Sequence, residues 1–196
     1  MKLLMEFFKM KEKVIKQSIK IKIENFDELI NKLRRNGCIF LGGGLETIKR
    51  YDTIEKKYEK KGIYFRTIDS DFQKCFEVKE KIDDDELIRS RLDTEIEIEN
   101  VEKMEYILKL LGCNYIRIME KYTQTWKYYD ATIILDELKF GNYITIEGNL
   151  EKIEEFCKEF QIDINNKLLV TYWEIFDDMY NEKDILFEKG YVSKML

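Results

Sequence analysis

The chain has 196 residues, of which 44% are hydrophobic, so it is long enough to bury one core and short for two domains. Its net charge is −5 although 37% of its residues are charged, and this mixture gives no basic field that would attract nucleic acid. The absence of histidine excludes Ser-His-Asp and Cys-His nucleophilic catalysis and every His-ligated metal site.

Residues 1–13 contain an apolar run that is interrupted by Glu6, and they lack an A-x-A-like cleavage site. We expect an N-terminal arm or a short helix here, and neither a signal peptide nor a membrane span. The four cysteines lie far apart without a CxxC pair, so neither a zinc ribbon nor a redox motif is indicated. Free thiols in a reducing cytosol are the simplest interpretation, which predicts a cytoplasmic protein with no membrane partner.

Residues 19–38 and 94–113 superpose without a gap. In each copy an alternating strand is followed by Glu-Asn, by a helical segment with apolar residues three to four positions apart, and by Gly-Cys. Asn25 and Asn100 are N-cap candidates, and the glycines stand where a left-handed C-terminal cap is needed. Residues 143–160 form a weaker third copy. A structural duplication explains the shared residues; the alternative is a coincidental succession of strand and helix.

Further strands are expected at residues 63–68, 75–81, 117–129 and 131–138. Roughly eight strands with three or four helices indicate an α+β fold, in which an antiparallel sheet curls or closes and the helices pack on its outside. The isoleucines of the alternating strands would then meet the helices, and the charged faces would point inward.

Strict alternation in LDTEIEIEN places Asp93, Glu95, Glu97 and Glu99 on one face of a strand. One interpretation is a half-buried strand whose acidic face meets solvent, as is common in antiparallel sheets. The other is that these carboxylates line a cavity that holds a metal ion or a cationic group.

Other expected strands also carry charged residues at alternate positions, and the strand of the first repeat copy carries lysines where the second copy carries acids. The relevant residues are Arg66, Lys79, Arg89 and Arg91 among the cations and Asp136 and Glu147 among the carboxylates. A cavity lined by both signs suits a polyphosphate that is bound through a divalent metal ion. The alternative is a set of weak cross-strand salt bridges on a solvated face.

Seven segments carry a resemblance to a known family. They are, in chain order, VIKQSIKIKIENFDEL, RYDT, YFR, FEVKEK, RSRLDTEIEIEN, ILDELKFGNYITIEG and LVTYWEIF. In this order and spacing they resemble the CYTH superfamily, which includes class IV adenylate cyclases, thiamine triphosphatases and inorganic triphosphatases. The resemblance implies an eight-stranded antiparallel β-barrel, the triphosphate tunnel, with helices packed on the outside. It covers residues 14–180, between an N-terminal arm (1–13) and a C-terminal tail (181–196).

Residues 171–196 are expected to include a surface helix. The alternative is a helix that plugs the tunnel mouth or docks a partner.

The resemblance also implies roles for individual residues. Lys20 matches the lysine that ends the family's ExExK signature, and Lys20 and Lys79 are the catalytic candidates. The expected phosphate-binding residues are Arg66, Lys79, Arg89 and Arg91. The expected metal ligands are Glu95, Glu97 and Glu147, with Asp136 near the metal.

This chain departs from the ExExK signature. Lys16 and Ser18 stand where the two glutamates are expected, and a register shifted by two residues puts Ser18 and Lys20 there instead. Thr145 stands where the second acidic strand of the family has its first glutamate, which leaves Glu147. A lysine near a hard divalent cation adds a repelling charge, so the family's metal-dependent chemistry is not expected in full. A single-metal site built from the remaining carboxylates is the open alternative.

The functional prediction is an enzyme that depends on Mg²⁺ or Mn²⁺ and acts on a triphosphate-bearing substrate, as a phosphohydrolase or an adenylate cyclase. Its partner would be a phosphorylated small molecule such as ATP, thiamine triphosphate or tripolyphosphate, and a homodimer is an open alternative. The first rival is a non-catalytic module that binds a nucleotide or polyphosphate. The second is a structural or partner-binding domain that keeps only the fold.

Overall fold

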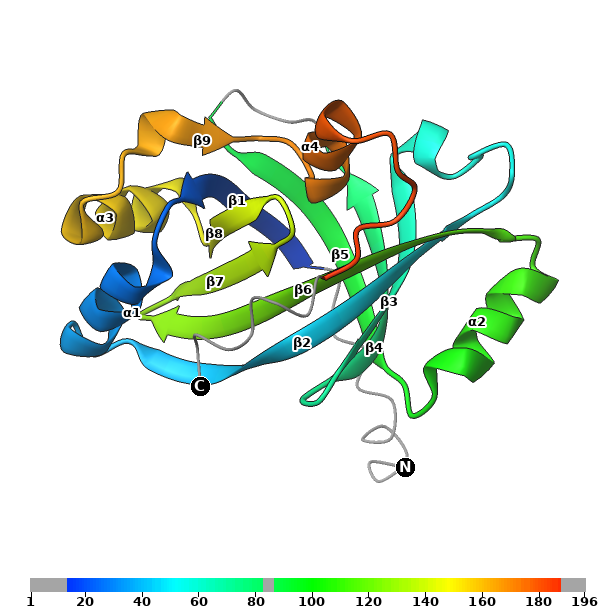
Figure 1. The fold of residues 1–196 in the computed structure, drawn as a ribbon, viewed down its shortest axis with the longest axis horizontal. Helices are drawn as coiled ribbons and strands as arrows, with labels where there is room; N and C mark the ends of the chain where they lie inside the picture. Colours follow the sequence, from blue (N-terminus) through cyan, green and yellow to red (C-terminus); the bar gives the residue numbers. More distant parts are fainter. Residues whose placement is uncertain (1–13, 83–86, 188–196) are drawn as a thin grey trace, which may run out of the picture.

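The computed structural model describes residues 14–82 and 87–187, which form an α+β unit (Figure 1). Its strands are β1 (Val14–Ile23), β2 (Ile39–Asp52), β3 (Ile63–Ser70), β4 (Lys74–Lys81), β5 (Arg89–Glu97), β6 (Tyr115–Tyr128), β7 (Ala131–Leu138), β8 (Gly141–Glu147) and β9 (Lys167–Leu168). Its helices are α1 (Phe26–Arg35), α2 (Val101–Leu110), α3 (Leu150–Phe160) and α4 (Tyr172–Met179), with short 3₁₀ turns at Glu59–Lys61 and Ile164–Asn166. The predicted N-terminal arm and residues 188–196 of the predicted tail lie outside the described residues. No helix in the described ranges has the length and apolar character needed to cross a membrane.

Eight strands close into an antiparallel ring in the order β5-β4-β3-β2-β6-β7-β8-β1, and β1 pairs back with β5. β1 closes the ring because its residues 14–18 pair with β5 while residues 18–23 pair with β8. β9 pairs with β1 at Lys20 and Ile21. The predicted closed antiparallel sheet of eight strands, with helices outside it, is confirmed.

Helices α1 and α3 cover the outside of the ring at β1, β7 and β8. Ile19 and Ile21 of β1 are almost fully buried in one hydrophobic cluster with Leu33 of α1 and Phe156 of α3. Figure 1 shows α2 at the opposite end of the ring from these two helices. Burial of apolar area is the main force that holds the helices to the sheet, and it leaves the other face of each strand for the interior.

The two repeat copies adopt the same local structure. The side chains of Asn25 and Asn100 each accept a backbone N–H of the first helical turn, at N···O distances of 2.8 and 2.7 Å. Gly37 and Gly112 follow the helices with φ of 72° and 88°, the left-handed conformation that glycine adopts without strain. The third copy differs, because α3 ends at Phe160 and the residue after it, in the left-handed conformation with a φ of 56°, is Gln161 instead of a glycine.

The segment after β9 lies against the ring. Trp173 and Phe176 of α4 are buried in a cluster with residues of β2, β6 and β8. Further along, the backbone of Ile185 exchanges hydrogen bonds with Ile118 and Glu120 of β6, at 2.8 and 2.7 Å. Because α4 also contributes side chains to the interior cavity described below, a helix at the tunnel wall describes it better than an isolated surface helix.

Candidate functional site

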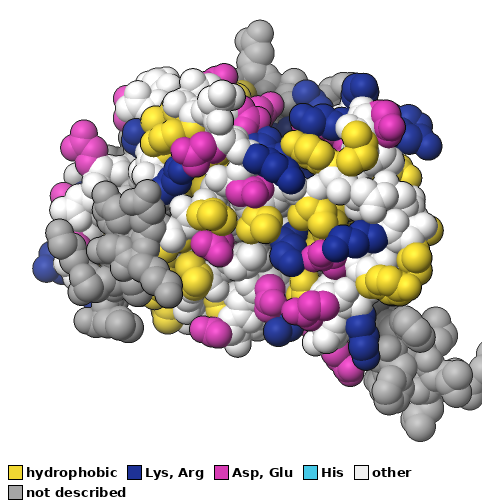
Figure 2. All heavy atoms as spheres, turned by 45° about the vertical axis from the view of Figure 1, so that its right-hand side comes forward, with side chains coloured by type: hydrophobic (Ala, Val, Ile, Leu, Met, Phe, Trp, Pro, Cys, Tyr) yellow, Lys and Arg dark blue, Asp and Glu magenta, His cyan; other side chains and the backbone are white. Residues whose placement is uncertain are grey.

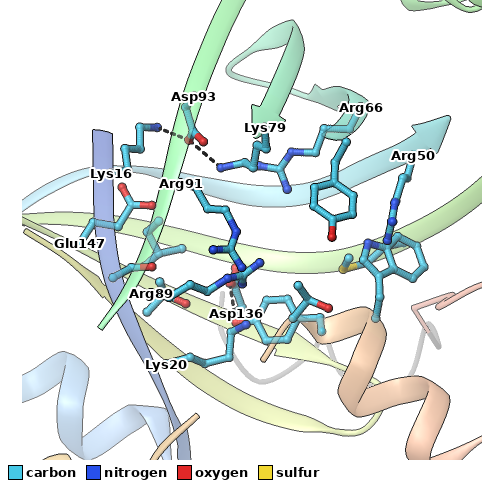
Figure 3. A pocket seen from close by; sticks show the side chains of 18 of the residues that line it. Lys16, Lys20, Arg50, Arg66, Lys79, Arg89, Arg91, Asp93, Asp136 and Glu147 are labelled. Atoms are coloured by element: carbon cyan, nitrogen blue, oxygen red, sulfur yellow. Dashed lines mark hydrogen bonds and ion pairs between the residues drawn. The ribbon is translucent and has the colours of Figure 1, made fainter. Parts of the chain in front are cut away.

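A cavity of about 190 Å³ lies inside the ring, and charged side chains of several strands point into it (Figure 3). Among the described residues, eight Lys or Arg side chains and three Asp or Glu side chains line it. We call it the cationic chamber. Its basic residues are Lys16, Lys20, Arg50, Arg66, Lys79, Arg89, Arg91 and Lys121, and its acidic residues are Asp93, Asp136 and Glu147. Since a water occupies about 30 Å³ of liquid, the cavity has room for a small anion.

Strand alternation puts these charges in the interior. On β1, Lys16 and Lys20 line the chamber while Ile19 packs outward against the helices. On β5, Arg91 and Asp93 point inward by the same period of two. The outer face drawn in Figure 2 differs from the chamber, because basic and acidic side chains are interspersed on it. Basic residues therefore outnumber acidic residues in the chamber lining, although the net charge of the protein is −5.

A second cavity, of about 350 Å³, adjoins the first. The two cavities share Lys16, Arg66, Lys79, Lys121, Ile134 and Glu147 in their linings. We call the second one the mixed-charge chamber, because Glu46, Glu77 and Glu95 add carboxylates to its wall. Leu41 and Phe72, which are both exposed to solvent, also line it.

Two buried carboxylates between the chambers hold three cations. Arg66 Nε donates to Glu77, and Lys79 Nζ lies 2.7 Å from Asp93 Oδ2 and 3.3 Å from Glu77 Oε1. Lys16 Nζ lies 3.4 Å from the same Asp93 oxygen. Burial acts to raise the pKa of Glu77, but Arg66 and Lys79 outweigh it and lower this pKa to about 2. Burial and the neighbouring Arg66 lower the pKa of Lys79.

Lys121 is the centre of a second buried network. Its Nζ lies 2.7 Å from Asp136 Oδ1 and 3.1 Å from Glu46 Oε1. The Tyr172 hydroxyl donates to the other Asp136 oxygen at 2.8 Å. Burial acts to lower the pKa of Lys121, but the two carboxylates raise it well above its ordinary value. Lys121 therefore remains charged at neutral pH.

Lys20 has a different electrostatic environment. Its Nζ donates to the Val170 carbonyl at 3.2 Å and lies 3.6 Å from the centre of the Tyr172 ring. Burial and repulsion by Arg89 lower the pKa of Lys20 to about 7, although Asp136 opposes this shift. Both protonation states are therefore accessible near neutral pH, which suits a group that exchanges protons.

Helix α4 is fixed in place over the cationic chamber. Thr171 and Glu174 form a reciprocal capping box at its start. Two guanidinium nitrogens of Arg117 on β6 donate to Asp177 at 2.9 and 2.6 Å, and the same guanidinium lies 4.5 Å from the Trp173 ring centre. These contacts hold Trp173 in the chamber wall.

The structure places the sequence-predicted site residues in three locations. In the cationic chamber it brings together Lys20, Arg66, Lys79, Arg89, Arg91, Asp136 and Glu147. Glu95 lines the mixed-charge chamber. Glu97 lies at the exposed end of β5 and lines neither chamber.

Sequence reasoning missed or undervalued several buried members of the site. Glu77 and Asp93 could have been found, because each lies two residues from an inward-facing charge on its strand. Lys121 lies on β6, where both faces of the strand carry polar and apolar residues, so the sequence pattern does not show which face points inward. Glu46 lies on β2, which was not among the expected strands.

The acidic residues do not fit a resident metal ion. No group of three or more His, Cys, Asp or Glu side chains in the described ranges is arranged to hold one. In the chamber walls, Glu46, Glu77, Asp93 and Asp136 are each ion-paired with Lys or Arg. A hard divalent cation needs several oxygen ligands at one point, and this arrangement does not supply them.

Comparison with protein-family models gives no match. A protein of Methanocaldococcus jannaschii, named "putative adenylate cyclase", is 25% identical over 194 residues, which cover 92% of this chain and 98% of that protein. The match spans nearly the whole of both chains.

Solved structures share the fold. One, from Vibrio parahaemolyticus and of the same name, has a TM-score of 0.68 and 17% identity, covering 84% of this chain and 98% of its own. Another, the Hippeastrum protein HpAC1, is described as having a dominant triphosphatase activity; its TM-score is 0.58 and its identity 12%, with 84% of this chain and 96% of its own covered. The resemblance to the CYTH superfamily is confirmed for the fold.

Proposed function

We propose that this CYTH-like chain is an enzyme that acts on a triphosphate-bearing substrate, whose phosphates lie in the cationic chamber. The observation that carries the proposal is the set of eight basic side chains inside the closed ring of an acidic protein. Confined like charges of this kind favour a multiply charged anion among them. The names of the relatives, an adenylate cyclase and a protein with triphosphatase activity, support the same substrate class.

Arginines are the main phosphate-binding groups in this proposal. Arg66, Arg89 and Arg91 reach the chamber from β3 and β5, and a guanidinium can donate two parallel hydrogen bonds to phosphate oxygens. Lys79, whose Nζ lies 2.7 Å from Asp93 Oδ2, adds a point charge beside Arg66 (Figure 3). Together these cations would neutralise the charge that develops on the transferred phosphoryl group.

Lys20 is the proposed proton-transfer residue. In hydrolysis a water attacks the terminal phosphorus, the bond to the bridging oxygen breaks, and diphosphate leaves. The neutral Lys20 amine would accept the proton of the attacking water, and its ammonium form would return a proton to the leaving oxygen. A cyclase reaction would use the substrate's own 3′-hydroxyl at the α-phosphorus and release pyrophosphate.

Mg²⁺ or Mn²⁺ enters this proposal only as a counter-ion that the substrate brings. The ion pairs of Asp93 and Asp136 with lysines support this assignment, and so does the lack of a metal-binding group of carboxylates among the described residues. No step is assigned to the metal.

The experiment that tests the proposal measures turnover. Tripolyphosphate, ATP and thiamine triphosphate are each incubated with the protein, with Mg²⁺, with Mn²⁺ or with EDTA, and phosphate and cyclic AMP are quantified. Lys20→Met is the matched variant, and we expect it to lose about 100-fold or more of the rate, as is typical for a general acid or base. Absence of turnover with all three substrates would refute the proposed enzymatic activity.

A second candidate function is a binding module that holds a nucleotide or polyphosphate without chemistry. The observation that favours it is the replacement of signature carboxylates by Lys16 and Ser18 in the chamber wall. Calorimetry with tripolyphosphate distinguishes the two candidate functions, since binding without turnover supports the binding module. Absence of binding would exclude both candidate functions.

A further inference from the structure

Lys16 of β1 extends into the most acidic part of the tunnel wall. Its ammonium lies 3.4 Å from Asp93 Oδ2, and Figure 3 shows the side chain beside Glu147 and Asp93. Lys16 and Glu147 both line the two chambers, and Glu77 and Glu95 line the mixed-charge chamber with them. One ammonium therefore faces carboxylates that come from β4, β5 and β8.

The electrostatics of Lys16 agree with this position. Burial on its own acts to lower the pKa of Lys16, but the carboxylates of Glu147, Asp93, Glu77 and Glu95 raise it above its ordinary value. Lys16 is therefore charged at every physiological pH. Carboxylates gathered in one wall repel one another unless cations lie among them, and Lys16 is one of the cations present.

We infer that the Lys16 ammonium is a fixed cation that takes the place of a divalent metal ion among Glu77, Asp93, Glu95 and Glu147, so that the tunnel binds phosphate without a resident metal. Three observations carry this inference. First, the Lys16 ammonium lies within ion-pair distance of Asp93. Second, Lys79 pairs with Asp93 and Glu77, and Arg66 pairs with Glu77. Third, the described carboxylates form no metal-binding group. A divalent ion placed here would meet the repulsion of these cations before it reached several oxygens.

The ligand of such a tunnel should be a polyphosphate without bound Mg²⁺. A polyphosphate that is already neutralised by Mg²⁺ interacts less strongly with lysine and arginine. This preference for the metal-free polyphosphate rests on the proposed function. The role of Lys16 among the carboxylates is independent of the proposed function, since it can be tested without phosphate.

The first experiment measures Mn²⁺ binding to the full chain by electron paramagnetic resonance and calorimetry. Lys16→Met removes the charge and keeps the length, and Lys22→Met is the control, because Lys22 is an exposed lysine of the same strand that lines neither chamber. We expect at least tenfold tighter Mn²⁺ binding by Lys16→Met than by the wild type or Lys22→Met. Equal affinity of the wild type and Lys16→Met, whether strong or undetectable, would overturn the inference. Lys16→Gln, checked by circular dichroism, replaces Lys16→Met if the latter does not fold.

The second experiment measures tripolyphosphate affinity by calorimetry with EDTA or with excess Mg²⁺. We expect binding in EDTA, with affinity unchanged or reduced when Mg²⁺ is added. Binding that occurs only with Mg²⁺ would contradict the inference. Absence of tripolyphosphate binding in both buffers would refute the proposed function, and the comparison of Mn²⁺ affinities would still decide the role of Lys16.

Discussion

Lys121 and Asp136 form a buried ion pair in the wall of the cationic chamber, with Nζ and Oδ1 2.7 Å apart. Glu46 accepts the same ammonium at 3.1 Å, and the Tyr172 hydroxyl donates to the second Asp136 oxygen. The network thereby connects β2, β6, β7 and α4. Loss of Lys121 leaves two buried carboxylates without the cation that they share, and this penalty is larger than the net free energy of an average hydrogen bond.

Replacement of Lys121 by Met should destabilise the protein by about 3–5 kcal/mol, the usual effect of breaking a buried ion pair. The reason is that Asp136 and Glu46 would remain buried without their shared cation. Urea denaturation measures the free energy of unfolding. Lys103→Met, at an exposed position of α2, is the control and should change it by no more than about 0.5 kcal/mol. A similar small change for Lys121→Met would show that the pair does not stabilise the fold.

Replacement of Tyr172 by Phe should lower the free energy of unfolding by about 1–3 kcal/mol. The change removes only the hydroxyl, so the Asp136 oxygen loses a buried donor while the ring stays in place. Thermal and urea denaturation provide the measurement. Tyr106→Phe, at an exposed position of α2, is matched in chemistry and should be neutral. Equal stability of the two variants would contradict the assigned hydrogen bond.

Replacement of Arg91 by Gln should weaken tripolyphosphate binding by about 10- to 100-fold, because a hydrogen bond to a charged group contributes about 1.5–3 kcal/mol. Arg91 lines the cationic chamber and is nearly buried. Calorimetry at constant ionic strength measures the dissociation constant. Arg35→Gln, at an exposed position of α1, is the control and should bind like the wild type. An unchanged affinity for Arg91→Gln would exclude Arg91 from the phosphate site.

The affinity for tripolyphosphate should fall as pH rises through about 7. The pKa of Lys20 is lowered to about 7 by burial and by Arg89, so its ammonium is present below this pH and lost above it, and an anion favours the charged form. Tripolyphosphate itself titrates, so the dissociation constants of wild type and Lys20→Met are compared across pH 6–9. We expect the ratio of the two constants to change through neutral pH. A constant ratio would show that Lys20 does not titrate at the bound anion.

The lowered pKa of Lys20 also predicts that the free energy of unfolding rises with pH, whereas the affinity for tripolyphosphate falls. The unfolded chain keeps the Lys20 proton up to the ordinary value of 10.5, whereas the folded chain releases it near 7. Between these values the unfolded state binds more protons, so Lys20 contributes a free energy of unfolding that rises with pH. Lys20→Met should lack this contribution in urea denaturation, and an identical pH profile for both proteins would count against the shifted pKa.

Several features of the fold could be predicted because they depend on residues that are neighbours in sequence. Asn25 and Asn100 cap helices through bonds that span two or three residues, and Gly37 and Gly112 supply a backbone conformation that other residues resist. The alternation around Ile19 likewise assigns one face of β1 to the helices and the other to the interior.

The period of two assigns a face but not a depth along the tunnel. Glu95 and Glu97 share a face of β5, yet Glu95 lines the mixed-charge chamber and Glu97 is exposed at the strand end. Where a strand leaves the wall of the ring depends on the stagger of its neighbours, and this stagger is a property of the whole sheet.

The caps, the alternating strands, the α+β class and the inward faces of β1 and β5 can be read from the sequence, since they depend on the order of residues within each element. Which opposite charges pair depends on the tertiary structure. Lys16 meets Asp93 because β1 closes the ring against β5, and Lys121 meets Asp136 because β6 and β7 adopt one register. Closure and register are set by the pairing of all eight strands, so no local pattern shows that the carboxylates of this tunnel already hold the protein's own cations.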